Sequence, residues 1–225
     1  MRAGPFFRAG SGHGAAVSGH ARTERRALAD LMVETGPDAP TLCAGWTTRD
    51  LAAHLVVRDR EPWALPGMVL GGPAGRLTAS RTASTAQRSW PSLVEAVADG
   101  PPGWSPTRLA PVDDAANTLE YFVHHEDVLR PAGRRRQVDG ELADALWAQL
   151  RAPARLLHRR CPGGVELVRD DGATLTARPG GPVVRVVGPA GELVLWSFGR
   201  GAAADVELEG PPDAVAALRA SPPGA

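Results

Sequence analysis

The sequence has no lysine and no isoleucine, and it contains a single asparagine, Asn117, and a single tyrosine, Tyr121. All 25 basic residues are therefore arginines, and 25 acidic residues balance them to a formal net charge of zero. A protein that binds nucleic acid is expected to carry a clustered positive surface. The balance of charge argues against a nucleic-acid partner, and the run Arg134-Arg135-Arg136 is interpreted as a solvated loop.

Cysteine and long apolar runs are scarce as well. Cys43 and Cys161 are too few for a disulfide framework and lack the paired spacing of a zinc finger, so both are expected to pack as small apolar side chains. No apolar run approaches the roughly 20 residues that are needed to span a membrane. The N-terminus has no continuous apolar segment of the kind found in signal peptides. These absences favour a cytoplasmic protein with no membrane partner.

The hydrophobic pattern predicts helices in the first part of the chain. Residues 1–20 are rich in Gly, Ala and Ser without periodicity, which predicts a disordered tail. Thr47 and Asp50 form a T-x-x-D variant of the capping box, which predicts where the second helix begins. Five segments show helical spacing: residues 22–35, 48–60, 83–99, 112–130 and 140–158. Together they predict an antiparallel helical bundle over residues 21–158.

After about residue 160 the pattern changes to that of short strands. The β-prone runs are VELVRD, TLTARP, VVRVVG, ELVLWSFG and ADVELEG, with glycine-containing turns between them. A short helical run, PDAVAALRA, follows the last of these strands. The pattern predicts a small α+β domain over residues 160–221. The expected fold class is therefore α+β, with an N-terminal helical bundle and a small C-terminal α+β domain.

Residues 117–130, NTLEYFVHHEDVLR, gather polar side chains in an otherwise apolar stretch. On a helix, Glu120 and His124 share a face, so one oxygen and one nitrogen can point at a single cation. Such a pair arises often by chance, and a third ligand would strengthen it. His54 lies in LAAHLVV on the predicted 48–60 helix, where a hydrogen-bonded core histidine is the plainer interpretation.

Together His54, Glu120 and His124 form a set of two histidines and one carboxylate. Three protein ligands leave a coordination position open for water or substrate, as in catalytic rather than structural zinc sites. Imidazole and carboxylate suit zinc, and nickel, iron or manganese would also fit. His125 lies about 100° around the helix from His124, so it is interpreted either as a residue that supports the ligands from behind or as a boundary residue. Asp127 can accept the other N–H of His124, or it can be a surface carboxylate.

Three segments of the chain carry a family resemblance: LCAGWTTRDLAAHLVVRDR, EYFVHHEDV, and ELVLWSFGR followed by VELEGPPDAVAAL. The first two resemble the ligand motifs of the mycothiol-dependent maleylpyruvate isomerase family, which is part of the DinB-like metal-binding superfamily. The third resembles the closing strands of the small C-terminal domain in that family. The resemblance covers about residues 20–220. It implies a DinB-like four-helix bundle that holds a divalent metal, zinc in the isomerase, through His54, Glu120 and His124.

The resemblance also implies a chemistry. In the isomerase, the low-molecular-weight thiol mycothiol adds to a small unsaturated diacid and permits cis–trans isomerisation, and relatives transfer such thiols to electrophiles. Arg200 matches the Gly-Arg ending of the C-terminal motif and is the candidate for holding a substrate carboxylate; an arginine that caps a strand end is the alternative. The family often has a tryptophan at the position of Phe122, and it usually has small or apolar residues at the positions of His125 and Glu126. Maleylpyruvate as the substrate therefore does not carry over.

Two classes of function remain open. One is a mycothiol-dependent transferase or isomerase that acts on a small electrophile, with the thiol supplied from solution because neither cysteine is placed at the site. The other is a non-catalytic module that binds a metal or a ligand for stability or sensing. A hydrolase that uses metal-activated water is a third candidate, for which only Glu126 or Asp127 could serve as the base.

Overall fold

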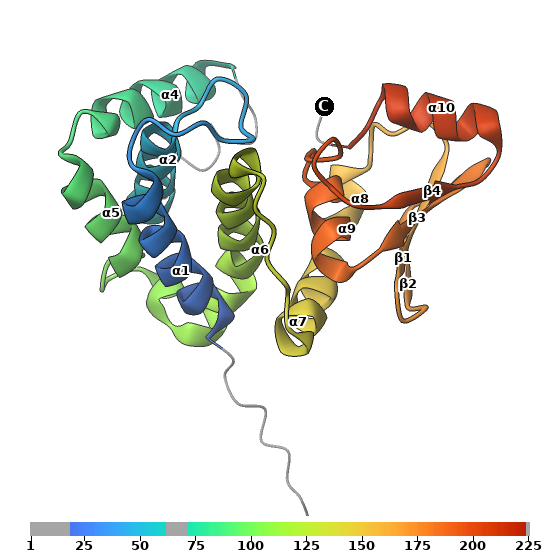
Figure 1. Cartoon of the computed structure of the whole chain (residues 1–225), viewed down its shortest axis with the longest axis horizontal. Coiled ribbons are helices and arrows are strands. Elements are labelled where there is room, and N and C mark those ends of the chain that lie inside the picture. Colours follow the sequence, from blue (N-terminus) through green and yellow to red (C-terminus); the bar gives the residue numbers. More distant parts are fainter. Residues whose placement is uncertain (1–18, 62–71, 224–225) are drawn as a thin grey trace, which may run out of the picture.

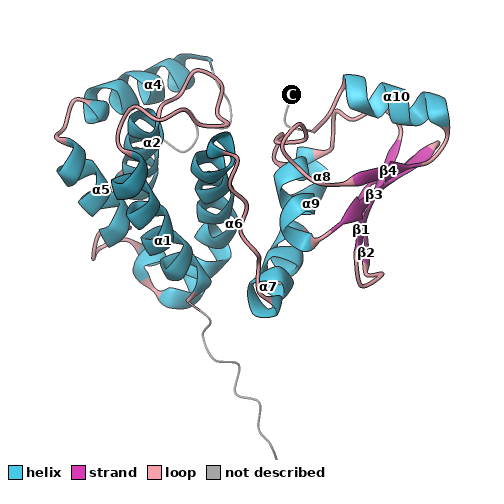
Figure 2. Ribbon diagram, viewed as in Figure 1, coloured by secondary structure: helices cyan, strands magenta, loops and turns pink. Residues whose placement is uncertain are grey.

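The computed structural model describes residues 19–61 and 72–223 (Figure 1). Residues 1–18, nearly all of the predicted tail, lie outside the described residues. The described chain forms a group of helices followed by a part that combines helices with a small sheet (Figure 2). The predicted α+β fold class is therefore confirmed. None of the described helices is both long and apolar enough to cross a membrane.

The helical part encloses one cluster of buried apolar side chains, which includes Leu28, Leu55 and Leu93. Its elements are α1 (His20–Thr35), α2 (Thr48–Arg60), α4 (Gly72–Ala86), α5 (Trp90–Asp99), a 3₁₀ turn η2 (Pro106–Arg108) and α6 (Ala110–Leu129). The helix predicted over 83–99 is divided, because α4 ends and α5 begins within it. Pro91 lies in the first turn of α5, where its missing N–H is not needed, whereas it could not continue a helix interior.

Helix α2 begins where the sequence predicts. The Thr47 side chain accepts a hydrogen bond from the backbone N–H of Asp50, and the Asp50 carboxylate accepts one from the Thr47 N–H at 2.9 Å. This reciprocal capping box satisfies two N–H groups that the first turn leaves without partners. Leu51 and Leu55 are buried on either side of His54. The cap therefore fixes the turn on which His54 stands.

The second part is built around a four-stranded sheet in the order β2-β1-β3-β4, in which β1 and β3 are parallel and the other pairs are antiparallel. Its helices are η3 (Arg130–Ala132), α7 (Gly140–Leu150), α8 (Ala154–Leu157), α9 (Ala190–Ser197) and α10 (Pro212–Ala220). Its strands are β1 (Gly164–Arg169), β2 (Thr174–Arg178), β3 (Val183–Gly188) and β4 (Glu207–Glu209).

The run ELVLWSFG is a helix, so its prediction as a strand was wrong. Within α9, every residue from Leu193 to Ser197 is buried. A helix that is apolar on all sides has no polar face, so its period cannot be distinguished from that of a buried strand. The other four β-prone runs form β1, β2, β3 and β4 as predicted.

Helix α7 packs with the sheet. Leu142, Leu146, Trp147 and Leu150 belong to the cluster that β1, β3 and α9 also line. The predicted bundle over residues 21–158 included this helix, whereas its apolar face contributes to the core of the second part. The boundary near residue 160 itself stays a prediction.

Helix α6 lies between the other helices of the bundle and the C-terminal part (Figure 1), and it contributes to both hydrophobic clusters. Tyr121, Val128 and Leu129 belong to the cluster of the bundle, and Phe122 and Val123 belong to that of the second part. A helix buried on opposite faces needs apolar residues all round. Helix α6 nevertheless buries many polar side chains, which need partners there: Asp113, Asp114, Asn117, Thr118, His124, His125, Glu126 and Asp127.

Candidate metal centre

Two helices bring the three predicted ligands together. His54 lies on α2, and Glu120 and His124 lie one turn apart on α6. The Nε2 atom of His54 is 3.6 Å from Oε1 of Glu120, and Nε2 of His124 is 3.2 Å from the same oxygen. One ligand atom from each residue lies within 4.8 Å of the other two. The three side chains therefore form one compact group.

The spacing of these donor atoms suits a tetrahedral metal ion. Zinc lies about 2.1 Å from nitrogen and oxygen ligands, which places two ligands of a tetrahedral ion roughly 3.4 Å apart. The separations of 3.2 and 3.6 Å lie on either side of that value. The side chains of His54 and Glu120 retain 15% and 23% of their exposure, so a small molecule can reach the group. The residues present fit a divalent ion with an open position.

Asp127 orients His124. Its Oδ2 is 2.9 Å from Nδ1 of His124, and the side chain of Asp127 is fully buried. An imidazole that donates from Nδ1 directs Nε2 to the ligand group. Burial alone would raise the pKa of Asp127, but His124 and Arg200 outweigh it and hold the pKa at about 2. Asp127 is therefore an anion that fixes the ring.

Arg200 reaches Asp127 from the C-terminal part of the chain. Its Nε donates to Oδ1 of Asp127 at 2.9 Å and its Nη2 donates to Oδ2 at 2.6 Å, while Nη1 donates to the Phe198 carbonyl at 2.6 Å. The strand-end cap that was considered for Arg200 does not apply, because the preceding segment is α9. Arg200 is therefore a partner of Asp127, and it is linked to His124 through Asp127.

Arg58 stands beside Glu120. It lies one turn after His54 on α2, and its Nε is 3.2 Å from Oε1 of Glu120. Its Nη1 donates to Oδ1 of Asn117 at 2.6 Å and its Nη2 donates to the Ala116 carbonyl at 3.2 Å. Burial would raise the pKa of Glu120, but Arg58 and the two histidines lower it well below its usual range. Glu120 is therefore an anion, as a metal ligand must be.

The two histidines differ in charge preference. Burial lowers the pKa of His54, which favours the neutral ring that binds metals. Burial also acts to lower the pKa of His124, but Asp127, Cys43 and Glu120 raise it well above its usual value. The carboxylates thus favour positive charge at this point in the structure, which a bound cation would supply.

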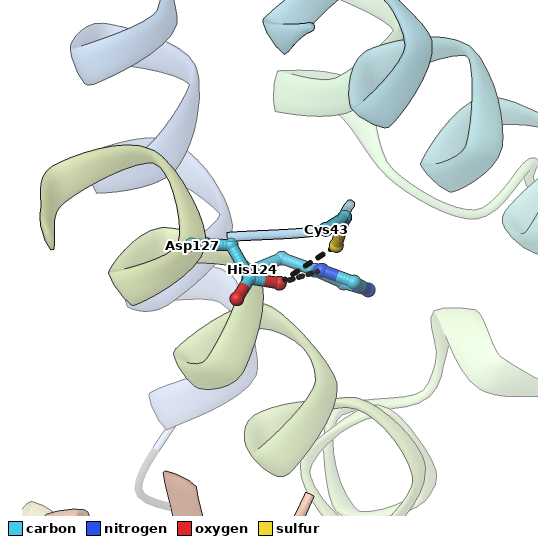
Figure 3. Close-up of side chains that lie close together, drawn as sticks. All are labelled: Cys43, His124 and Asp127. Atoms are coloured by element: carbon cyan, nitrogen blue, oxygen red, sulfur yellow. Dashed lines mark hydrogen bonds and ion pairs between the residues drawn. The ribbon is translucent and has the colours of Figure 1, made fainter. Parts of the chain in front are cut away.

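Cys43 lies beside His124 and Asp127 (Figure 3). Its Sγ is 3.2 Å from Oδ2 of Asp127 and 3.3 Å from Nη2 of Arg200. The loop is held there because the N–H of Leu42 donates to the Asp127 carbonyl at 3.0 Å. The expectation that Cys43 packs as a small apolar side chain away from the site is therefore wrong. Cys161 is buried as expected.

Asn117 and Tyr121 hold other polar groups inside the bundle. The Nδ2 of Asn117 donates to Oδ1 of Asp113 at 2.7 Å, and the hydroxyl of Tyr121 donates to Oδ2 of Asp59 at 2.5 Å. Burial raises the pKa of Asp59, and the Tyr121 bond lowers it in part. These two residues therefore support the site without entering it.

His125 and Glu126 point away from the ligand group. The Nδ1 of His125 lies 3.6 Å from Oε2 of Glu24 on α1. Glu126 accepts hydrogen bonds from Arg130 at 2.6 Å and from Arg136 at 2.8 Å. The interpretation of His125 as a boundary residue agrees with this placement, and Glu126 belongs to a network that joins α6 to the connection after it.

Sequence reasoning missed Cys43, Arg58 and the pairing of Arg200. Arg58 had a readable signal, because it lies four residues after His54 and so shares its face. The other two had none, since Cys43 and Arg200 are 84 and 73 residues from Asp127 and meet it only in the folded chain.

Residues 19–129 match the family model of the mycothiol maleylpyruvate isomerase N-terminal domain. The helical part of the chain belongs to this family. The mycothiol-dependent maleylpyruvate isomerase has been solved as a crystal structure, and so has a variant of it in which a histidine is replaced by alanine. Each is 17% identical to this chain and covers 86% of it and 93% of its own chain, with TM-scores of 0.51 and 0.50.

At this identity the likeness to the isomerase structures concerns the fold. It extends beyond the mycothiol maleylpyruvate isomerase N-terminal domain into the sheet-containing part, since 86% of the chain is covered. Among curated proteins, no sequence matches this one. These comparisons indicate the family and the fold, whereas the reaction depends on the residues of the site.

Proposed function

We propose that the protein binds one divalent metal, most suitably zinc, through His54, Glu120 and His124, and that it uses a low-molecular-weight thiol such as mycothiol as a transferase or isomerase. The carrying observation is the separation of the donor atoms, which fits a tetrahedral ion with one position left open. The substrate would be a small electrophile. The cytoplasmic location expected from the sequence stays a prediction.

A divalent cation at this donor set would lower the pKa of a bound thiol and so supply a thiolate near neutral pH. The protein's own residues prepare the site for it. Asp127 keeps the proton of His124 at Nδ1, so that Nε2 stays a ligand atom. Arg200 keeps Asp127 in place, and Arg58 offsets the charge of Glu120. The role of Arg200 in holding a substrate carboxylate stays a prediction, and the pairing of Arg200 with Asp127 argues against that role.

Elemental analysis of protein purified without an affinity tag tests the metal. We expect near-stoichiometric metal in the unchanged protein and its loss in His54→Ala. The matched control is His125→Ala, which removes the same type of side chain at a position that faces Glu24. Loss of metal in His125→Ala but not in His54→Ala would overturn the ligand assignment.

Thiol binding separates the enzyme from the non-catalytic module. We expect metal-loaded protein to bind mycothiol in calorimetric titration and to turn over one member of an electrophile panel, with both signals lost in His54→Ala. Absence of thiol binding at millimolar concentration would instead leave the metal-binding module. The exposure of His54 and Glu120 favours the enzyme, since a purely structural metal site is closed.

The hydrolase has less support. Its two candidate bases are both paired with arginines: Glu126 with Arg130 and Arg136, and Asp127 with Arg200. A carboxylate held in this way is a poor proton acceptor, because the neighbouring cations stabilise its charged form.

A further inference from the structure

A cavity of about 480 Å³ opens beside the ligand group. It lies between α2, the loop before α2, and α4, and His54 belongs both to its wall and to the donor set. Pockets that bind small molecules commonly have this size and adjoin the reacting groups. A substrate that meets a thiol at the donor set would therefore rest against this wall.

The wall of the cavity is apolar apart from a few groups. Helix α4 contributes glycine, alanine and threonine side chains, among them Ala79, Thr82 and Ala83, and the loop contributes the indole of Trp46. Among the described residues of the wall, the single carboxylate is that of Asp50, which already accepts hydrogen bonds from the Thr47 N–H and hydroxyl at 2.9 and 2.8 Å. Asp50 would repel an anionic ligand.

No arginine is among the described residues that line this cavity. Three arginines of the bundle and the candidate metal centre are engaged elsewhere. Arg81 on α4 makes two hydrogen bonds to Glu61, at 3.0 and 2.9 Å. Arg58 serves Glu120 and Asn117, and Arg200 serves Asp127. Freeing Arg200 for a ligand would leave a fully buried carboxylate without its cation, which is strongly unfavourable.

We infer that the cavity binds the body of a neutral, apolar electrophile, such as an uncharged α,β-unsaturated ketone, rather than a dicarboxylate. The inference rests on the proposed function for its chemistry and on the cavity wall for its selectivity. In the reaction, the thiol sulfur forms a bond to the β carbon, the C=C π pair moves toward the carbonyl, and the α carbon takes up the proton given by the thiol. The sum is an addition that needs no oxidant and releases no leaving group.

Binding of an unreactive matched pair tests the cavity directly. Benzylacetone and hydrocinnamate have almost the same shape, and only hydrocinnamate carries a charge. We expect calorimetric titration of metal-loaded protein to show that benzylacetone binds at least roughly tenfold more tightly, because the wall offers a carboxylate no cation to replace its water. Hydrocinnamate can also coordinate the metal, so only binding that a cavity-filling variant abolishes counts.

Ala79→Trp is that variant, and Ser80→Trp is its matched control, because Ser80 is exposed on the same helix and does not line the cavity. We expect Ala79→Trp to weaken benzylacetone binding roughly tenfold or more, and Ser80→Trp to leave it unchanged. Thr82→Arg places a cation in the wall and should reverse the preference toward hydrocinnamate. Circular dichroism and metal content confirm that each variant is folded.

Hydrocinnamate binding that equals or exceeds that of benzylacetone, and that Ala79→Trp abolishes, would overturn the inference. So would the absence of benzylacetone binding to a protein that does bind mycothiol, and the proposed function would then survive. Benzylacetone binding without any thiol binding would overturn the proposed function and leave the cavity's selectivity standing. As a reaction test, benzylideneacetone should be consumed faster than its para-carboxylate.

Discussion

At the scale of single residues, the carboxylate of Asp127 joins His124 to Arg200, and both partners depend on its charge. In Asp127→Asn the amide offers Arg200 a weaker acceptor and no longer fixes the proton of His124. We expect the zinc dissociation constant to rise about 10- to 100-fold, as measured by competition with a chromophoric chelator. His125→Gln is the control, since it changes a neighbouring buried side chain outside the ligand group. Equal affinities in the two variants would show that Asp127 does not orient the ligand.

His158 is a second residue whose effect can be isolated. It is fully buried, its Nδ1 lies 2.7 Å from the Ala154 carbonyl, and its ring stacks on Trp196 at 5.4 Å. Burial lowers the pKa of His158, and the bond to Ala154 opposes this in part. As the pH falls, His158 therefore binds a proton in the unfolded chain before it does so in the folded chain. Stability contributed by the neutral ring is complete above the unfolded pKa of about 6.5 and declines as the pH falls below it.

In His158→Phe the stack is kept and the titrating group is removed. We expect the free energy of unfolding to fall less steeply between about pH 6.5 and pH 5 than in the unchanged protein, by up to about 1.4 kcal/mol per pH unit. Urea unfolding at a series of pH values measures the two slopes. Parallel slopes would mean that His158 titrates alike in the folded and unfolded chains.

At the scale of elements, α2 depends on its first turn. Thr47→Ala removes the oxygen that accepts the Asp50 N–H, so the free energy of unfolding should fall by about 1 kcal/mol. Thr47→Ser keeps that oxygen and should cost only a few tenths. Urea denaturation of both variants gives the difference. A Thr47→Ser variant as unstable as Thr47→Ala would point to the threonine methyl group rather than to the cap.

The elements also show what the sequence could predict. Helix α2 was predicted to the residue, because a cap fixes its start and an apolar face gives its period. Helix α6 was predicted to within two residues at its start and one at its end. Helix α9 was mistaken for a strand because burial on every side removed the alternation that reveals period. Helices with one solvent-exposed face could be recognised from their periodicity, whereas a helix without such a face could not be distinguished from a strand.

At the scale of the whole molecule, a chain of buried charges joins the bundle to the second part. Glu126 is 1% exposed and pairs with Arg130 and Arg136. Arg130 continues to Glu192 on α9 at 2.6 Å, and Arg136 continues to Glu24 on α1 at 2.5 Å. The network therefore ties three helices through the connection that follows α6.

Removing the central charge of this network should be costly. In Glu126→Gln each arginine keeps one other carboxylate, so we expect destabilisation of about 3 kcal/mol, the low end for a broken buried pair. Glu34→Gln breaks the exposed pair with Arg134 and should change stability by less than about 1 kcal/mol. Urea unfolding of both variants is the measurement. Similar small effects would mean that the buried network is no more important than a surface pair.

The candidate site also shows that contacts between residues far apart along the chain could not be predicted from the sequence. His54, Glu120 and His124 could be proposed from helical spacing within two segments and from a family resemblance. Cys43 and Arg200 reach Asp127 from a loop and from the C-terminal part, and no local pattern records such a meeting. The sequence indicated which residues share a helix face, but it did not indicate which distant side chains complete the site.

Because α6 contributes apolar residues to both clusters, the family match that ends at residue 129 does not end at a folding boundary. A fragment cut there would expose Phe122 and Val123 to water and would leave Asp127 without Arg200. Such a fragment should aggregate when it is expressed alone, whereas the full chain should not. The segment that matches the family model is therefore shorter than the segment that is expected to fold by itself.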